Sequence, residues 1–326
     1  MTVQPVWPGE LDRFLDLREP AIHRDDVKSY VEQMIAKGSM REEWCYVASE
    51  GGRALGRLAY WTMPGEAHPL SLVLLDLPWV EDGCAEIGRR LLQESLPAMR
   101  ALGAREIEHV LDVPVMAPQW QTHPEARMRF LEEAGFAQIR QTCRFERIPG
   151  KSATVDKGDA GLSFRSLAEV GETAFIAAIE QANRGTLDLR EQGDRDRLGP
   201  VEHARRAFED LRRMAYEPDW WQLAYTPSGE LVGLIMPAKS PTFATIGFIG
   251  VVPEHRGRGY IHALLRRGTA ILEAAGVAPI RADTDVNNHP MANAFAQAGY
   301  AAFANRREYR IELDSRTESS AAAIGV

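Results

Sequence analysis

The sequence has few cysteines and no long apolar run, and these absences exclude several classes of protein. Its three cysteines, Cys45, Cys84 and Cys143, form no C-x-x-C pair, so neither a disulfide framework nor a zinc site is expected. No apolar stretch approaches the roughly 20 residues that a membrane-spanning helix needs. The N-terminal residues lack a basic segment followed by an apolar one, so they predict no signal peptide. We therefore expect a cytoplasmic protein without a membrane partner.

Positive charge is also in deficit. The chain carries 38 Lys and Arg against 46 Asp and Glu, which gives a formal net charge of −8. This balance provides no general attraction for nucleic acid, although a local basic patch could still bind it. What is present is ordinary for a globular protein, with 45% hydrophobic and 26% charged residues. The length of 326 residues favours two domains over one.

The chain contains a weak internal repeat. Trp44–Gly56 reads WCYVASEGGRALG and Trp221–Gly233 reads WQLAYTPSGELVG, and each is typical of a β-hairpin. A second pair, Leu131–Phe145 and Phe295–Tyr309, shares an Ala-Gly-aromatic triplet and a closing aromatic residue. Because the two pairs occur in the same order, the sequence predicts two similar domains.

A linker is predicted between these domains. Residues 149–161, PGKSATVDKGDAG, are small, polar and glycine-rich, which is typical of a domain boundary. They separate a first domain at 1–148 from a second at 162–313. The Ser- and Ala-rich residues 314–326 are predicted to be a disordered tail.

Each half shows the same predicted order of elements. Apolar runs predict strands at Leu70–Leu75 and Thr245–Val252, and the 3.6-residue period predicts the helices Ala85–Leu102 and Ile261–Ala275. Hairpins, strands and helices that alternate in this way predict an α/β fold, with a mixed sheet in each domain. The polar segment Arg184–Pro200 predicts a mobile substrate loop, with a solvated linker as the alternative.

The segment VVPEHRGRGYIHALL, which starts at Val251, combines a strand, a glycine-rich loop and a helix. A helix N-terminus offers unpaired backbone N–H groups and positive potential. Gly257 and Gly259 let the backbone approach an anion, and Arg256 and Arg258 add charge. These features favour a diphosphate ligand; the alternative is a basic turn with solvated arginines.

Two motifs resemble those of the GCN5-related N-acetyltransferases (GNAT). V-x-P-x-x-R-G-x-G in this loop is similar to their pyrophosphate-binding pattern, although Ile261 stands where Gly or Ala is usual. NHPMANAFAQAGY, from Asn288 to Tyr300, is similar to their Asn-x-x-Ala-x-x-x-Tyr-x-x-x-Gly-Phe, with Phe295 in place of Tyr. The resemblance covers residues 162–313 and implies two tandem GNAT-like domains, each with a mixed, mostly antiparallel sheet flanked by helices.

The resemblance also implies the ligand and the residues that bind it. The co-substrate would be acetyl-CoA or another acyl-CoA, with no metal, and the Asn of the second motif would bind the pantetheine arm. The first half reads VEDGCAEIGRRLL at the place of the loop, and its carboxylates would repel a diphosphate. We therefore expect the first half to be a degenerate copy that serves packing or covers the substrate. The implied binding residues of the second half are Val251, Val252, Arg256, Gly257, Arg258, Gly259, Tyr260, Ile261 and Asn288.

The implied reaction is the attack of a small-molecule amine on the thioester, which requires loss of an amine proton. The predicted strand Thr245–Val252 carries no carboxylate. Asp283 and Asp285, two residues apart on a strand, are therefore candidate bases, with capping of the next helix as an equal alternative. Glu254 and His262 are weaker candidates, for which solvated positions are the preferred interpretation.

The sequence also leaves more than one interpretation for the acid that protonates the thiolate. Phe295 cannot donate a proton, so the family's tyrosine role falls to another residue. Tyr260 is the candidate, and packing against the cleft wall is the alternative. Phe295 itself is expected in the core.

Two other functions fit the same sequence. The donor could be an aminoacyl group on tRNA, with the helix Arg205–Arg213 in contact with the RNA backbone. Alternatively, the protein could bind CoA without catalysis, because the tyrosine is replaced and the base is unassigned. The sequence specifies neither the acyl group nor the amine, and it fits a monomer or a homodimer.

Overall fold

The computed structural model describes residues 1–15, 23–148, 161–240, 243–276 and 278–313. The chain forms two compact units, one made of Met1–Ile139 and Arg306–Val326 and the other of Arg140–Asn305. The predicted tail at 314–326, and the predicted linker apart from Gly161, lie outside the described residues.

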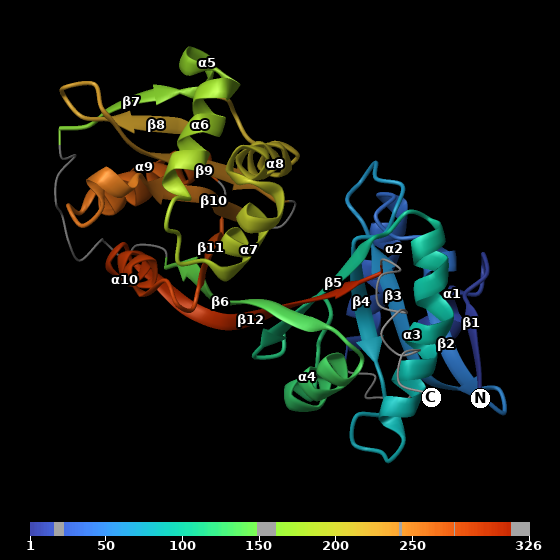
Figure 1. The fold of residues 1–326 in the computed structure, drawn as a ribbon. Helices are drawn as coiled ribbons and strands as arrows, with labels where there is room; N and C mark the ends of the chain where they lie inside the picture. Colours follow the sequence, from blue (N-terminus) through green and yellow to red (C-terminus); the bar gives the residue numbers. More distant parts are fainter. Residues whose placement is uncertain (16–22, 149–160, 241–242, 277, 314–326) are drawn as a thin grey trace, which may run out of the picture. The chain divides into compact units, whose positions relative to one another are not determined.

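The first unit is a sheet with helices on both faces (Figure 1). Its strand order is β1-β2-β3-β4-β5-β12; the first four strands are antiparallel neighbours, and β4 and β5 run parallel. Its elements are β1 (Thr2–Pro5), α1 (Leu11–Leu15), α2 (Arg24–Ala36), the 3₁₀ turn Glu42–Trp44, β2 (Cys45–Glu50), β3 (Arg53–Trp61), β4 (Ser71–Asp76), α3 (Cys84–Ala101), β5 (Glu106–Val113), α4 (Pro124–Glu133) and the second part of β12 (Tyr300–Glu312).

The second unit repeats this plan with strand order β12-β6-β11-β10-β9-β8-β7. β10 and β11 run parallel, whereas β10 with β9, β9 with β8, β8 with β7 and β11 with β6 are antiparallel pairs. Its elements are β6 (Ala137–Arg147), β7 (Ser163–Ser166), α5 (Leu167–Val170), α6 (Glu172–Ala182), α7 (Leu189–Leu198), α8 (Pro200–Arg212), β8 (Gln222–Tyr225), β9 (Leu231–Lys239), β10 (Ala244–Val251), the 3₁₀ turn Pro253–His255, α9 (Tyr260–Ala274), β11 (Ile280–Asp285), α10 (His289–Gln297) and the first part of β12.

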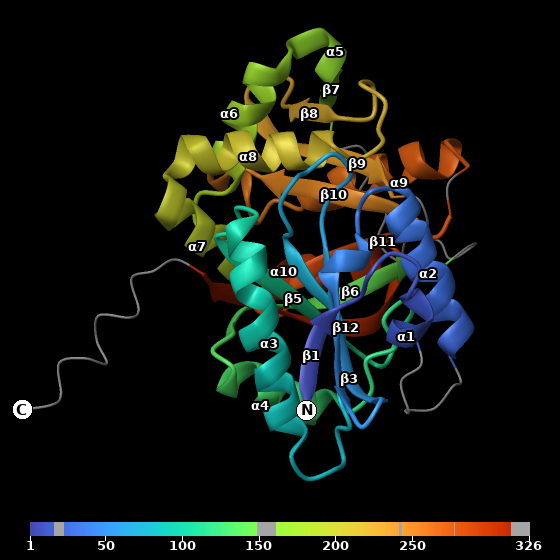
Figure 2. The ribbon, with the colours of Figure 1, turned by 90° about the vertical axis from the view of Figure 1, so that its right-hand side faces the viewer.

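Each unit has two apolar cores because side chains alternate across its sheet. In β9, Leu234 and Met236 pack with residues of α6 and α8, whereas Ile235 packs with residues of α9 and α10. In the first unit, α3 contributes to one core and α2 to the other, and Figure 2 shows the two helices on either side of the strands. The predicted mixed α/β fold with flanking helices is confirmed.

Strands β10 and β11 diverge, and this divergence opens the second sheet. Within the described residues they pair at only two positions, Ala244↔Ile280 and Thr245↔Arg281. Immediately afterwards, the register of β10 against β9 shifts around Gly247, which is a β-bulge that bends the strand. A Cβ at Gly247 would lie 2.4 Å from the end of the Leu211 side chain of α8, so a larger residue would require Leu211 to move. The remainder of β10 has a free side toward β11.

The compact units differ from the predicted sequence halves. The end of the first half, Arg140–Arg147 of β6, belongs to the second unit, where it pairs with β11. The end of the second half, Arg306–Glu312 of β12, belongs to the first unit. The repeat predicts the order of elements in each half. It does not predict that most of the last strand of each half belongs to the compact unit formed by the other half.

The predicted helices Ala85–Leu102 and Ile261–Ala275 agree within one residue with α3 and α9. The prediction of an irregular loop at Arg184–Pro200 was wrong, since α7 occupies most of it, with Asp188 as its N-cap. Among the described residues, the structure has no helix with the length and apolar character to span a bilayer.

Candidate active site

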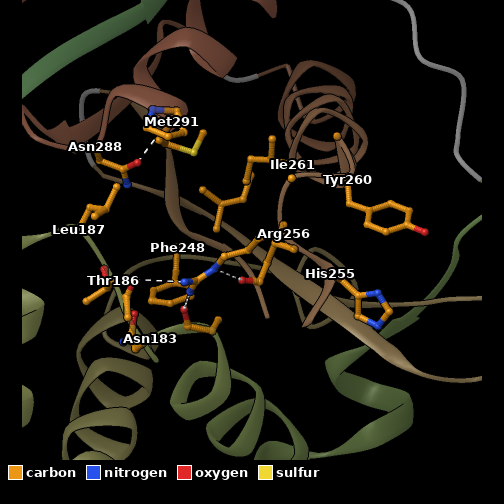
Figure 3. A pocket seen from close by; sticks show the side chains of 18 residues that line it. Asn183, Thr186, Leu187, Phe248, His255, Arg256, Tyr260, Ile261, Asn288 and Met291 are labelled. Carbon is orange, nitrogen blue, oxygen red and sulfur yellow. Dashed lines mark hydrogen bonds between the residues drawn. The ribbon is translucent and has the colours of Figure 1, made fainter. Parts of the chain in front are cut away.

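A cavity of about 490 Å³ lies where β10 separates from β11, and all its lining residues belong to the second unit (Figure 3). They come from the end of α6 and the following turn, from β10, from the loop into α9, and from the start of α10. They are Ala182, Asn183, Gly185, Thr186, Leu187, Phe248, Ile249, Gly250, Val251, His255, Arg256, Gly257, Gly259, Tyr260, Ile261, Asn288, Pro290 and Met291.

The backbone of β10 faces this cavity at alternate residues. Val252 N–H donates to Val232 O at 2.9 Å, so Val252 directs its backbone groups toward β9. In an antiparallel ladder these groups alternate in direction, so those of Ile249 and Val251 point away from β9, toward the diverging strand. An extended ligand could pair with them as an additional strand.

The loop before α9 turns at two glycines and ends at a helix N-terminus. Gly257 and Gly259 have φ of 75° and 81°, a left-handed conformation that glycine adopts without strain. Gly259 is the N-cap of α9, so the N–H groups of the first helical turn open at this point. Tyr260 and Ile261 start the helix and also line the cavity. Of the predicted binding residues, only Val252 and Arg258 are not among the lining residues.

Arg256 ties this loop to α6. Its guanidinium donates to three backbone carbonyls, those of Val251 at 3.0 Å, Gly185 at 3.1 Å and Ala182 at 2.8 Å. Burial is the largest influence on its pKa and lowers it. A guanidinium carries further N–H groups, so Arg256 can position the loop and still face an anion.

Asn288 has a fixed orientation at the start of α10. Its Oδ1 accepts the N–H of Met291 at 3.2 Å as an N-cap. The amide nitrogen is therefore the atom that Asn288 presents to the cavity, and Figure 3 shows it turned toward Leu187. As a donor it can bind a carbonyl oxygen.

The two candidate bases on β11 do not line the cavity. Asp285 is 1% exposed, and its carboxylate accepts from Asn287 N at 2.8 Å and from Leu189 N at 3.2 Å. Asp283 forms an ion pair with Arg144 of β6 at 3.3 Å. Asp285 thus holds the turn after β11, but the helix that it contacts is α7 and not the following helix α10, whose N-cap is Asn288.

The other proton-transfer candidates are placed differently. Tyr260 lines the cavity, but its ring packs edge-on against His255, with centroids 5.9 Å apart. Figure 3 shows its side chain directed away from Asn288 and Leu187. Glu254 pairs with Arg184 at 3.3 Å, and neither Glu254 nor His262 lines the cavity. Among its described lining residues there is no carboxylate.

The cavity wall formed by Asn183–Leu187 overlaps the predicted substrate loop Arg184–Pro200, whereas Asn183 itself was missed. This segment follows α6 as a turn, and Arg256 holds it through the carbonyl of Gly185. Asn183 is the C-cap of α6, and Gly185 has a φ of 62°. Asparagine followed closely by glycine is a helix-stop signal, and it could have located this turn.

The corresponding place in the first unit is filled by its own chain. Strands β4 and β5 also diverge, since Ser71↔Glu108 is the one pair recorded between their described residues. The backbone N–H of Leu74, at a bulge of β4, donates to Gln119 Oε1 at 3.2 Å. Gln121 bonds to the backbone of β5 on the other side, at 2.7 and 3.3 Å. Two glutamines thus occupy strand backbone groups of the first unit at the point where β4 and β5 separate.

The described residues include no cluster of three or more His, Cys, Asp or Glu suited to a metal ion. The mainly apolar lining and the backbone cradle instead suit an organic anion with an extended, amide-containing arm.

Comparison with known proteins agrees with this geometry. Residues 187–300 match the model of the acetyltransferase (GNAT) family, whereas no curated protein sequence matches the chain significantly. A solved GCN5-related N-acetyltransferase from Sphaerobacter thermophilus is 17% identical, with a TM-score of 0.61 over 95% of both chains. A tandem GNAT protein from the clavulanic acid biosynthesis pathway is also 17% identical, with a TM-score of 0.51 over 95% of this chain and 98% of the other.

A functionally unknown conserved protein from Staphylococcus epidermidis is 12% identical, with a TM-score of 0.51 over 82% of this chain and 93% of the other. At these identities the structural likeness concerns the fold, while the family match concerns the cavity-bearing part of the sequence. The chain therefore has the fold of tandem GNAT proteins, and its second half carries a domain of the acetyltransferase (GNAT) family.

Proposed function

We propose that this protein is an acyl-CoA-dependent N-acyltransferase, with acetyl-CoA as donor and a small-molecule amine as acceptor. One observation carries the proposal: the free side of β10 and the N-terminus of α9 open into the same cavity. An extended thioester arm that ends in a diphosphate requires this combination. The second unit would hold the donor, and the first half would be the degenerate copy.

The donor would be held mainly by backbone groups. The diphosphate would lie at the N–H groups of Gly257–Ile261, where the α9 dipole favours negative charge. The pantetheine arm would pair with Ile249 and Val251, and Asn288 Nδ2 would donate to one of its carbonyls. Ile261 still supplies its backbone N–H, because an N–H donor at a helix start does not depend on side-chain type.

The Ile249 N–H is well placed for the chemical step. It would donate to the thioester oxygen, whose negative charge grows as the amine attacks. The amine nitrogen bonds to the carbonyl carbon, the C–S bond breaks, and the amine proton ends on the thiolate, so that an amide and CoA thiol are formed. A cavity without carboxylates favours the uncharged amine, because burial lowers an amine pKa.

Substitution at Ile249 tests the proposal. Ile249→Pro removes an N–H that pairing with β9 does not use, whereas Ile249→Ala keeps it. We expect acetyl-CoA to bind the wild type and the alanine variant in calorimetric titrations, and amines to release CoA thiol. The proline variant should lose at least about tenfold in kcat/KM, or about 1.4 kcal/mol. Failure of the wild type to bind millimolar acetyl-CoA would overturn the proposal.

A non-catalytic CoA-binding protein is the second candidate. Phe295, in the place of the family tyrosine, is 1% exposed and stacks on Phe145 at 5.2 Å, so it is a core residue. Binding of acetyl-CoA without thiol release from any amine would favour this candidate.

The tRNA-dependent alternative gains little support from α8. Arg205 pairs with Glu202 and Glu209, and Arg212 pairs with Glu172. Arginines paired in this way offer less attraction to a phosphate backbone.

A further inference from the structure

Asn183 is a cavity residue without an assigned role. It follows α6 directly as its C-cap, is 5% exposed and lines the cavity. Its backbone is fixed, because its N–H donates to Ile179 O at 2.9 Å. What its side chain can bind depends on which way the amide is turned.

The orientation of this amide is set by Glu191. Asn183 Nδ2 donates to Glu191 Oε2 at 2.9 Å. A carboxylate only accepts hydrogen bonds, so the amide oxygen must face elsewhere. Within the described part of the chain, no hydrogen bond to Asn183 Oδ1 is recorded, and this oxygen is left for the cavity.

Glu191 is itself held by His203 of α8. His203 Nε2 lies 3.2 Å from the same Glu191 oxygen, and its hydrogen bond to Glu191 is the first cause that raises the His203 pKa. The imidazole is 5% exposed, so its position is defined by packing. With His203 Nε2 as a donor, the Glu191 carboxylate accepts from both side chains and keeps the Asn183 amide in one orientation. A negative partner also polarises the amide, which strengthens its oxygen as an acceptor.

The other polar side chains of the cavity present different groups. Asn288 offers its nitrogen, because its oxygen caps α10. Thr186 Oγ1 already accepts from Asp188 N at 3.3 Å. Asn183 Oδ1 is therefore a side-chain acceptor of the cavity that the fold keeps in place.

We propose that Asn183 binds substrate by accepting a hydrogen bond from an N–H group, while Glu191 and His203 act as positioning residues that fix its amide. This rests on the proposed function, under which two N–H sources reach the cavity. One is the pantetheine amide of the donor, and the other is the amine of the acceptor. Asn183 and Asn288 would then recognise complementary groups, since one accepts and the other donates.

The test compares Asn183→Leu with Glu191→Gln. The leucine variant removes the amide oxygen and the brace to Glu191 together. The glutamine variant keeps an acceptor for Nδ2 but loses the charge that fixes the orientation. Calorimetry gives Kd for acetyl-CoA and for CoA, and steady-state assays give kcat and both KM values. Thermal melting confirms folding, and Asn183→Ser replaces the leucine variant should that one not fold.

We expect Asn183→Leu to raise the Kd or KM of one substrate at least about fivefold, and Glu191→Gln to raise it less. A higher Kd for both acetyl-CoA and CoA identifies the pantetheine amide, whereas a higher KM for the amine alone identifies the acceptor. Unchanged constants in Asn183→Leu would overturn the inference. A loss in Asn183→Leu together with unchanged constants in Glu191→Gln would overturn the positioning role of Glu191. Both results require a wild type that binds acetyl-CoA, so they differ from failure of the proposed function.

Discussion

At the residue scale, His109 is a histidine that the first unit keeps uncharged. It is fully buried, and burial is the largest cause that lowers its pKa from 6.5 to about 4. Nδ1 lies 2.9 Å from Leu72 O, so Nδ1 carries the proton. Nε2 then accepts from Gln121 Nε2 at 3.3 Å. A second proton on the ring would make Nε2 a donor that faces another donor, the amide nitrogen of Gln121.

This arrangement predicts acid sensitivity of folding. Between pH 6.5 and about 4 the unfolded chain binds a proton that folded His109 does not, so stability is complete above 6.5 and falls as pH decreases. From about pH 7 to pH 5 the loss should be about 2 kcal/mol. Urea unfolding at both pH values should show this loss in the wild type and a smaller one in His109→Gln. His289→Gln, at an exposed position, serves as control. If His109→Gln lost as much stability between the two pH values as the wild type, the prediction would be refuted.

Asp285 allows a direct distinction between catalysis and positioning. Its contacts with Leu189 N and Asn287 N predict that Asp285→Ala leaves buried donors unsatisfied, at a cost of about 1–3 kcal/mol. We expect a lower Tm and weaker acetyl-CoA binding, with kcat at saturation within about twofold. If Asp285 were instead the catalytic base, Asp285→Asn would lower kcat at least about 100-fold and leave the Kd for acetyl-CoA unchanged. Asp283→Asn is the matched control on the same strand.

The sequence predicted backbone sites better than side-chain roles. The positions of Gly257, Gly259 and Asn288 at helix starts follow from local turn and capping rules. The hydrogen bonds that occupy the Asp285 carboxylate could not be predicted in this way, since its partner Leu189 lies 96 residues away. Asn183 was missed although its partner Glu191 is close in sequence, because no local pattern shows that the Glu191 carboxylate folds back onto the end of α6.

At the scale of elements, the contact between the phosphate loop and the end of α6 depends on Arg256. Arg256→Ala should weaken acetyl-CoA binding by about 10–100-fold, or about 1.4–2.8 kcal/mol. Arg256→Lys should be nearly as weak, because an ammonium cannot span three carbonyls as a guanidinium does. Arg258→Ala, which removes an exposed charge of the same loop, should have a smaller effect. Titration calorimetry of the three variants measures these affinities. Full affinity in Arg256→Lys would mean that the positive charge alone, and not the hydrogen bonds to the carbonyls, supports acetyl-CoA binding.

Elements with a clear apolar period were predicted closely, as α3 and α9 show. Helix α7 was not, because its sequence is polar and contains Gly193, which lowers helix propensity. Its N-terminus is fixed from outside by Asp285, through Leu189 N, and by an ion pair between Arg140 and the N-cap Asp188. Tertiary contacts therefore impose a helix where local propensity favours a loop.

At the scale of the whole molecule, the repeat predicted two similar domains but not the exchange of their last strands. Local pattern identifies β6 and β12 as strands, because each follows a helix and an Ala-Gly-aromatic turn. It does not select their neighbours, which lie far away in sequence: β6 pairs with β11, as in Thr142↔Asp285. A unit boundary inside a strand has no signal in composition.

The two units together predict the binding stoichiometry of the chain. In the first unit, Leu74 N–H is bound to Gln119, and Gln121 and His109 bond to neighbouring strand backbone, so a thioester arm would have to displace internal hydrogen bonds. In the second unit the backbone N–H groups of Ile249 and Val251 point away from β9, beside the cavity. Calorimetry should therefore show about one acetyl-CoA per chain, and Ile249→Pro should weaken that single event while Gln119→Ala leaves the stoichiometry unchanged. Two equivalents for the wild type, or a second equivalent in Gln119→Ala, would show that the first unit also accepts the donor.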